Sequence, residues 1–232
     1  MAVITINGQR GSGAREIGAE LARQLQYDYV DRLILSEAAR HLGATVEAVE
    51  DKWQRSPGLG ERLSRFLERL MERSATAGAG GDPYFGPGLG VLLGQDYPDA
   101  VTEPISNADQ LEDEHFLEAT QNVIVNLADS GNVVIIGRAG NHILKERPDA
   151  LHVGLVSTLE SRVEVVAKRE GLSPDEAKRF TIETEKARIE YFRKFFKSSA
   201  DDPADYHLML NTHIVDQSTA TDIIIRVNES RS

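Results

Sequence analysis

A glycine-rich segment follows the first apolar stretch of the chain, and its residue types suit the binding of a phosphate group. Residues 2–6 are apolar or β-branched, and the sequence GQRGSGAR follows at residues 8–15. Glycines at a turn between a strand and a helix let several backbone N–H groups face one anion. The predicted phosphate-binding loop consists of Gly8, Gln9, Arg10, Gly11, Ser12, Gly13, Ala14 and Arg15.

This segment matches the phosphate-loop pattern GxxxxGK[ST] only in part. Gly8 and Gly13 fall on the two glycines, whereas Ala14 stands in the lysine position and Arg15 in the position of the metal-binding hydroxyl. Ser12 and Arg15 are the candidates to supply the missing chemistry, with Ser12 as the oxygen ligand of a metal ion. A strand-to-helix turn that binds nothing is the alternative interpretation.

Two further polar pairs follow apolar, strand-like segments. Asp31 and Arg32 come after residues 27–30, and Gly137 and Arg138 come after residues 133–136. Ligands of parallel α/β sheets bind at the carboxyl ends of the strands, so these pairs are candidate binding residues. Asp31 is equally well explained as the cap of a following helix. Arg138 ends a buried strand, which favours a functional role over a surface ion pair.

Alternating strand and helix patterns predict a doubly wound α/β fold, with a parallel sheet and helices on both of its faces. Capping-box sequences at Ser157 to Glu160 and at Ser173 to Glu176 each predict the start of a helix. Strand patterns cover residues 2–6, 27–30, 133–136, 151–156 and 207–211. Helix patterns cover residues 14–25, 33–42, 46–54, 61–73, 109–129, 157–169 and 174–197, while residues 219–227 fit either a helix or a strand.

Composition excludes several classes of protein. The 232 residues carry a formal net charge of −11 and include no cysteine, which rules out disulfides, thiolate nucleophiles and Cys-based zinc sites. An acidic chain is unsuited to general nucleic-acid binding, because phosphate backbones are held by surplus Lys and Arg. The first residues lack a signal-peptide pattern, and no apolar run approaches the ~18 residues that would span a bilayer. We therefore expect a cytoplasmic protein without nucleic-acid or membrane partners.

The order of these motifs resembles the cytidylate kinase-like family, a branch of the bacterial-type CMP kinases among the P-loop nucleoside monophosphate kinases. The resemblance lies in ITINGQRGSGAREIGAELA at residues 4–22, YVDR at 29–32, VVIIGRAGNHIL at 133–144, an Arg-rich helix, and YHLMLNT at 206–212. It implies a P-loop NTPase-like fold over residues 1–232 that transfers the γ-phosphoryl group of ATP to CMP or dCMP, with Mg²⁺.

The resemblance also implies a role for individual residues. Gly8, Gly11, Ser12, Gly13 and Arg15 match the donor phosphate loop. Asp31, beside Arg32, matches an acidic residue that hydrogen-bonds the acceptor nucleotide, and Arg138 matches an arginine that grips the acceptor phosphate. Arg162 and Arg188 align with arginines of a lid and its flanks, which close over the transferring group, and the lid is here residues 173–200. In place of the two aspartates that usually flank the Gly-Arg pair, this chain has Ile136 and Ala139.

Two other functions stay open. A nucleotide-binding module that no longer transfers phosphate would explain the absent lysine, and a P-loop kinase with another small acceptor would explain residues 45–108, an insert with no recognisable CMP-binding segment. Residues 74–104 of that insert are rich in Gly and Pro and predict a loop or a mobile acceptor-side segment. Aromatic residues at 191, 192, 195 and 196 predict packing or a subunit contact, in a monomer or a homodimer. The histidines show no metal-ligand spacing, and His142 is the one closest to the Gly-Arg pair.

Overall fold

The computed structural model describes residues 2–31 and 107–231, and the chain divides into two compact units. One unit holds Met1–Arg32 and Ala128–Ser232, and the other holds Leu33–Leu127. The fold and the site described below belong to the first unit. Arg32, the helices predicted within residues 33–73 and the predicted loop at 74–104 lie outside the described residues. Helix α4 (Asn107–Ser130), predicted at residues 109–129, begins in the second unit.

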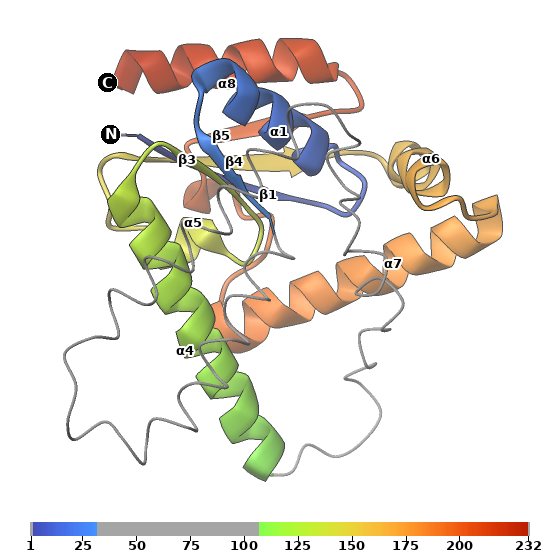
Figure 1. Cartoon of the computed structure of the whole chain (residues 1–232). Coiled ribbons are helices and arrows are strands. Elements are labelled where there is room, and N and C mark those ends of the chain that lie inside the picture. Colours follow the sequence, from blue (N-terminus) through green and yellow to red (C-terminus); the bar gives the residue numbers. More distant parts are fainter. Residues whose placement is uncertain (1, 32–106, 232) are drawn as a thin grey trace, which may run out of the picture. The chain divides into compact units, whose positions relative to one another are not determined.

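Five strands form one parallel sheet in the part of the chain that the structure describes. They are β1 (Val3–Gly8), β2 (Asp28–Val30), β3 (Val133–Ile136), β4 (Ala150–Val156) and β5 (Leu208–Asn211), in the order β2-β3-β1-β4-β5. Strand β1 pairs in parallel with β3 on one side and β4 on the other, with Val3 opposite both Val133 and Ala150. The predicted doubly wound α/β fold, like that of P-loop NTPases, is confirmed (Figure 1).

Strand β1 is longer than its sequence pattern predicts. The pattern places its end at Ile6, but Asn7 and Gly8 continue the pairing with β4 opposite Gly154 and Leu155. Strand β4 explains the extension, because β3 pairs with β1 only as far as Ile6 and β4 alone continues the pairing. Gly8 is therefore the last residue of the strand, and the glycine-rich loop starts at the edge of the sheet.

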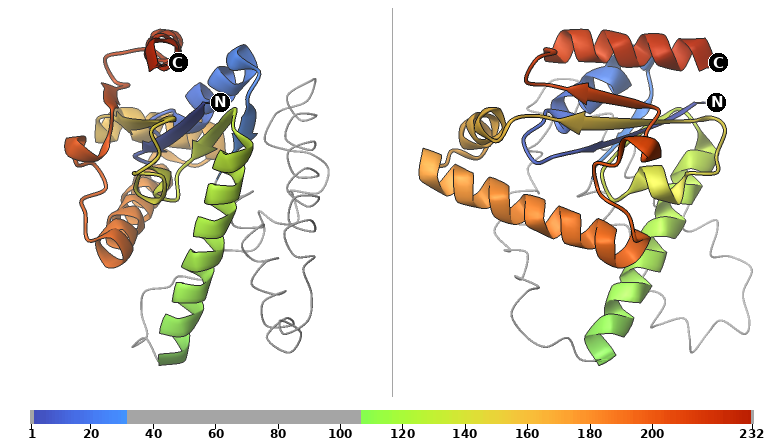
Figure 2. Two further views of the ribbon diagram at one scale, coloured as in Figure 1. Left: turned by 90° about the vertical axis from the view of Figure 1, so that its left-hand side faces the viewer. Right: turned by 180° about the vertical axis from the view of Figure 1, so that it is seen from behind.

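Helices cover both faces of the sheet. Helix α1 (Ala14–Leu25) packs against α8 (Gln217–Arg231) on one face, and the short α5 (Gly140–Ile143) contacts β1 and β4 on the opposite face (Figure 2). Residues 219–227, which fit either a helix or a strand by sequence, are thus helical. Gly18 lets α1 approach β3 closely, since an added Cβ would lie 2.4 Å from Cδ1 of Ile136.

Two helices, α6 (Leu159–Glu170) and α7 (Pro174–Tyr191), pack on each other after β4 and form the α6–α7 hairpin. The capping box of α7 is confirmed, with Ser173 accepting from Glu176 and Glu176 accepting from Ser173. The capping box predicted at Ser157 is wrong by one residue. Thr158 caps α6 by accepting from the Ser161 N–H, because the Ser157 N–H instead donates to Gln9 at 3.0 Å.

Helix α7 ends in a π-helical turn, Phe192–Phe196, before the 3₁₀ turn Pro203–Asp205 and β5. The predicted aromatic pairing is present, with ring centroids 5.2 Å apart for Tyr191 and Phe195 and 6.0 Å apart for Phe192 and Phe196. Phe192 is fully buried beside Ala139 and Ala200, so this aromatic group packs inside the unit. None of the helices described reaches the length and apolar character that a membrane crossing demands.

A buried histidine, His152, couples the sheet to protonation, and the exposed His207 packs on its ring. Nδ1 of His152 on β4 lies 2.8 Å from the Thr5 hydroxyl on β1, and its ring stacks on His207 at 5.0 Å. Nδ1 of His207 accepts the His152 backbone N–H at 2.9 Å. Burial, with the nearby His207, lowers the pKa of His152 to about 4. The folded state therefore holds this imidazole in its neutral form.

We predict that His152 makes the protein less stable as the pH falls from 6.5 toward 4. The unfolded chain binds a proton near pH 6.5 whereas the folded state resists it, so the free energy of unfolding drops by up to about 1.4 kcal/mol per pH unit in this window. Urea unfolding between pH 4.5 and pH 7.5 measures this slope. The slope should be shallower in His152→Gln and unchanged in His213→Gln, an exposed control. Equal slopes in wild type and His152→Gln would refute the assignment.

Candidate functional site

The loop between β1 and α1 has the backbone that an anion cradle requires. Gly11 and Gly13 adopt φ angles of 88° and 81°, in the left-handed region that favours glycine, and the Ser12 N–H donates to the Gln9 carbonyl at 2.9 Å. Gly13 caps α1 without a side-chain hydrogen bond, so the first N–H groups of the helix keep their donors for another partner. The helix N-terminus adds partial positive charge at the same place.

Helix α6 is in direct contact with this loop. A Cβ added at Gly11 would lie 2.5 Å from the Arg162 carbonyl oxygen and 2.9 Å from the Arg162 Cα. Gly11 is therefore needed for two separate reasons, its backbone angle and the contact with α6. The same contact brings Arg162 from α6 to the glycine-rich loop, a position that its sequence separation alone does not reveal.

The Ser12 side chain was predicted to ligate a metal ion, and its surroundings are compatible with one oxygen ligand. Its Oγ is buried and has no hydrogen-bond partner among the described residues. Mg²⁺ usually binds one or two protein oxygens together with phosphate oxygens and water. The described residues contain no cluster of three or more His, Asp or Glu side chains able to hold a metal ion. Ser12 thus fits as a single protein ligand beside a bound phosphate.

Two carboxylates join the α6–α7 hairpin and the following segment to the loop. Oε1 of Glu185 accepts from Nη2 and Nε of Arg188 at 2.7 and 3.1 Å, and its Oε2 accepts the Arg10 backbone N–H at 3.2 Å. Asp201 accepts from Arg188 at 2.6 Å and from the Gln9 amide at 2.9 Å. Burial alone would lower the pKa of Arg188, but bonding to Glu185 and Asp201 raises it. Arg188 is therefore held as a charged donor beside the loop.

Arg162 stands on the other side of the same carboxylate. Its Nη1 lies 3.7 Å from Glu185 Oε2, while its Nε and Nη1 form no hydrogen bond with the residues that the structure describes. Only 8% of the residue surface is exposed. A buried guanidinium whose donors form no hydrogen bonds is less stable than one in water, and an oxyanion that accepted those hydrogen bonds would stabilise it.

More ion pairs surround the loop at its edge. Arg10 donates to Glu170 at 3.0 Å and lies over the Phe180 ring, with 5.0 Å to the centroid. Arg169 contacts both Glu16 and Glu170. Arg193 lines a separate hollow. Arg10, Arg162, Arg169 and Arg188 are thus each paired with a carboxylate of α1, α6 or α7.

The second polar edge lies at the ends of β2 and β3, which are neighbours in the sheet. Asp31 follows β2 and is buried, and Arg138 follows β3 by two residues. The chain turns there through Gly137, Arg138 and Ala139, with φ angles of 80°, 52° and 54°. Left-handed angles at two non-glycine residues cost about 1–2 kcal/mol each and persist where the surrounding structure enforces them. Asp31 and Arg138 therefore share one sheet edge, whereas Arg32 lies outside the described residues.

The two positions that flank the Gly-Arg pair belong to the apolar core. Ile136 is buried against Gly18, and Ala139 is fully buried beside Phe192 and Ala200. A carboxylate in either place would be desolvated without a partner, which costs several kcal/mol. The substitutions at Ile136 and Ala139 therefore agree with the packing around them.

Polar side chains of β1 and α5 lie next to the turn that carries Arg138, and of these the sequence indicated only His142. The Asn7 amide donates to the Asn141 Oδ1 at 2.7 Å, and both side chains are buried. His142 stacks on Phe196 at 5.1 Å and has its Nε2 3.4 Å from Asp205. Burial lowers the pKa of His142, against the attraction of Asp205, so His142 tends toward its neutral form. These contacts fix α5 and the turn that carries Arg138.

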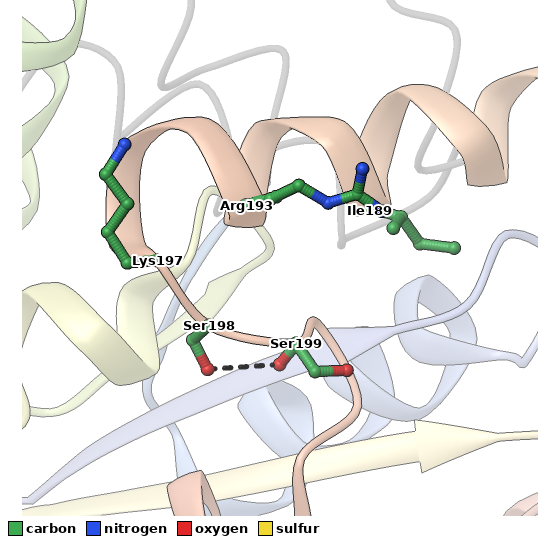
Figure 3. Close-up of a pocket in the computed structure, with 5 residues that line it drawn as sticks. All are labelled: Ile189, Arg193, Lys197, Ser198 and Ser199. Carbon is green, nitrogen blue, oxygen red and sulfur yellow. Dashed lines mark hydrogen bonds between the residues drawn. The ribbon is translucent and has the colours of Figure 1, made fainter.

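A hollow of about 410 Å³ lies beside the end of α7, away from the loop residues described above. Its lining residues are Ile189, Arg193, Lys197, Ser198 and Ser199 (Figure 3). Ser198 donates to the Ser199 carbonyl at 3.3 Å, and the Lys197 amine donates back to the Lys194 carbonyl. Its polar groups are thus largely engaged with their own chain segment, and none comes from the glycine-rich loop.

Sequence reasoning found part of this arrangement. The predicted loop, Arg162 and Arg188 come together, and Asp31 and Arg138 lie at the adjoining strand ends. Arg15 is half-buried in the first turn of α1. Glu185 and Asp201 were missed. A glutamate three residues before an arginine on a helix is common and usually forms a surface pair, so Glu185 did not stand out beside Arg188. The only available signal was that Glu185 and Arg188 lie on the helix already predicted as the lid.

The chain belongs to the Cytidylate kinase-like family, which its residues 3–214 match. A cytidylate kinase from Methanopyrus kandleri is 34% identical over 93 residues, which make up 37% of this chain and 48% of that protein. The chain thus matches about half the length of this curated relative. A crystal structure of an uncharacterized protein from Eubacterium ventriosum has a TM-score of 0.64 at 18% identity, over 99% of both chains. That likeness concerns the fold, whereas the family membership implies a kinase-like, nucleotide-binding protein.

We predict that Gly11→Ala destabilises the protein by at least about 2 kcal/mol, since the added methyl meets the Arg162 carbonyl in a left-handed backbone. Gly171→Ala is the matched control, with φ at 67° but open space around its Cβ, and should cost about 1 kcal/mol. Chemical denaturation of both variants measures the difference. Equal losses would contradict the proposed contact between the loop and α6.

Proposed function

We propose that this protein is a nucleoside monophosphate kinase that transfers the γ-phosphoryl group of ATP to CMP or dCMP. The observation that carries the proposal is the convergence of the glycine-rich loop, Arg162 and Arg188 at one point beside the carboxyl ends of β1 and β4. Membership of the Cytidylate kinase-like family supports the choice of acceptor. Arginines are the preferred ligands of phosphate oxygens, because their planar fork donates two parallel hydrogen bonds.

The residues divide into a donor side and an acceptor side. On the donor side, the backbone N–H groups of residues 8–15 and the N-terminus of α1 bind the ATP phosphates, with Arg15 in place of the usual lysine. Arg162 and Arg188 neutralise charge on the group in transfer. On the acceptor side, Arg138 binds the acceptor phosphate, while Asp31 and Arg32 hydrogen-bond the nucleotide. Such positioning and charge neutralisation are the main requirements of phosphoryl transfer.

The reaction forms a bond between the γ-phosphorus and an oxygen of the acceptor phosphate and breaks the bond to the leaving ADP oxygen. Mg²⁺, when bound, supplies charge neutralisation between the phosphates, and Ser12 is the residue proposed to contact it. The α6–α7 hairpin lies beside the loop, where it can exclude water from the transferring group. Exclusion of water is needed because ATP would otherwise be hydrolysed.

A coupled ADP-release assay with MgATP and each of CMP, dCMP, UMP, AMP and GMP tests the proposal. We expect turnover with CMP or dCMP, and a large loss in Arg15→Ala, which also controls for contaminating kinases. Turnover with a different acceptor would keep the kinase and replace the substrate. Silence with every acceptor would refute the nucleoside monophosphate kinase and favour the nucleotide-binding module or a P-loop kinase with another small acceptor.

We predict that Arg138→Ala lowers kcat/KM by ~10²-fold or more, the effect of removing one donor that stabilises charge in the transition state. Arg226→Ala, in which an exposed arginine of α8 is lost, is the matched control and should keep its kinetics. Steady-state kinetics with saturating MgATP and varied acceptor give the comparison. Unchanged kinetics in Arg138→Ala would remove Arg138 from the site.

A nucleotide-binding module without transfer activity is the second candidate. Two observations favour it, the alanine in the lysine position of the loop and the apolar packing of Ile136 and Ala139, where the resemblance implies carboxylates. Calorimetry separates the two candidates. Tight ATP binding in a protein without turnover would favour the module, and fast turnover would exclude it.

A further inference from the structure

The Glu185 carboxylate is bound by the groups that a phosphate would need. Its Oε2 accepts the Arg10 backbone N–H at 3.2 Å and lies 3.7 Å from Arg162 Nη1, and its Oε1 receives both donors of the Arg188 fork. One loop N–H and two guanidinium groups are a typical donor set for a phosphate group. The Glu185 side chain is only 12% exposed, so the carboxylate is largely shielded from water and depends on these donors.

We infer that Glu185 occupies a phosphate position in the nucleotide-free protein and must be displaced when a polyphosphate binds. The inference rests on the proposed function, since it concerns the same loop and arginines. Two anions cannot share these donors, because like charges at close range repel strongly in a buried site. Polyphosphate binding therefore breaks the Glu185 contact with Arg10 and transfers Arg162 and Arg188 from the carboxylate to the phosphate.

The charges of the cluster agree with this exchange. Among the residues named here, the positive side chains of Arg162 and Arg188 face the negative side chains of Glu185 and Asp201, so this group of side chains is close to neutral. After Glu185 leaves, Asp201 still holds Arg188 at 2.6 Å and the Gln9 amide at 2.9 Å. Arg188 then keeps its place beside the loop while its remaining donors bind the incoming anion.

This exchange makes the α6–α7 hairpin responsive to the nucleotide. Glu185 lies in α7, so the bond from its carboxylate to the Arg10 N–H ties the helix to the empty loop. Displacement releases that tie at the moment when a phosphate takes the site. The hairpin is thus closed by an internal anion before the nucleotide arrives and by the phosphate afterwards.

Glu185→Gln tests the inference, because it keeps the shape of the side chain and removes its charge. We predict that ATP and tripolyphosphate, each added without acceptor, bind this variant at least about tenfold more tightly than wild type, given that a hydrogen bond to a charged group is typically worth a tenfold effect or more. The variant without ligand should unfold at a lower temperature, because Arg162 and Arg188 lose an anionic partner. A purely structural role of Glu185 would lower the stability without tightening the binding.

Glu183→Gln is the matched control, since Glu183 is an exposed glutamate of the same helix. It should bind both probes as wild type does. Glu185→Asp serves if Glu185→Gln fails to fold, because the shorter side chain keeps the charge beside Arg188 but retreats from the Arg10 N–H. Its binding should tighten by about threefold, the effect of one lost hydrogen bond.

The outcomes separate this inference from the proposed function. If wild type binds the two probes and Glu185→Gln binds them equally or more weakly, the displacement is overturned and the phosphate site stays intact. Where only Glu185→Asp folds, the same result in that variant has the same meaning. Absence of binding to all four proteins by calorimetry would overturn the phosphate site itself, and the proposed function with it. Binding to Glu185→Gln but not to wild type would support displacement in its strongest form.

Discussion

The parallel pairing of β1 with β3 on one side and β4 on the other is the constraint on which the site depends. Both neighbours pair with β1 up to Ile6, and β4 continues the pairing to Gly8, where the glycine-rich loop leaves the sheet. The strands to either side end at the same edge, which places the Gly137-Arg138 turn beside the loop. The loop, Asp31 and Arg138 follow from this arrangement of strand ends, whereas Arg162 and Arg188 come to the loop from α6 and α7.

The second determinant is the burial of arginines next to the loop. A guanidinium removed from water is costly unless an anion takes over its hydration, and Glu185 and Asp201 provide that anion in the protein without nucleotide. The same cost favours anionic ligands in the proposed site, because a ligand that displaced a carboxylate would have to carry negative charge itself. The ion pairs that stabilise the fold therefore also restrict the ligands that the proposed site would accept.

The sequence predicted the features that arise from local pattern. The strand, the glycine turn and the helix at residues 2–25 follow from residue types within a short window, and the Ser173 capping box follows from two residues three positions apart. The bond between Gln9 and Asp201 joins residues 192 positions apart in sequence, and no local pattern marks it. Helix α5 was missed for a similar reason. It begins directly after Gly137, Arg138 and Ala139, whose left-handed backbone angles cannot be predicted from the apolar strand before them. Half of the candidate site thus depends on contacts that only the folded sheet creates.

Ile136 and Ala139 show how the departures from the resemblance fit together. The packing of Ile136 on Gly18 draws α1 close to β3, and the burial of Ala139 beside Phe192 anchors the turn that carries Arg138. A carboxylate at either position would break one of these contacts. The apolar residues at 136 and 139 are therefore needed for the packing that holds the left-handed turn. In the proposed kinase the groups that hold phosphates are arginines and loop N–H groups, and Glu185 pairs with two of those arginines. Among the described residues, the charged groups beside the loop are therefore the guanidinium groups of the α6–α7 hairpin with their carboxylate partners.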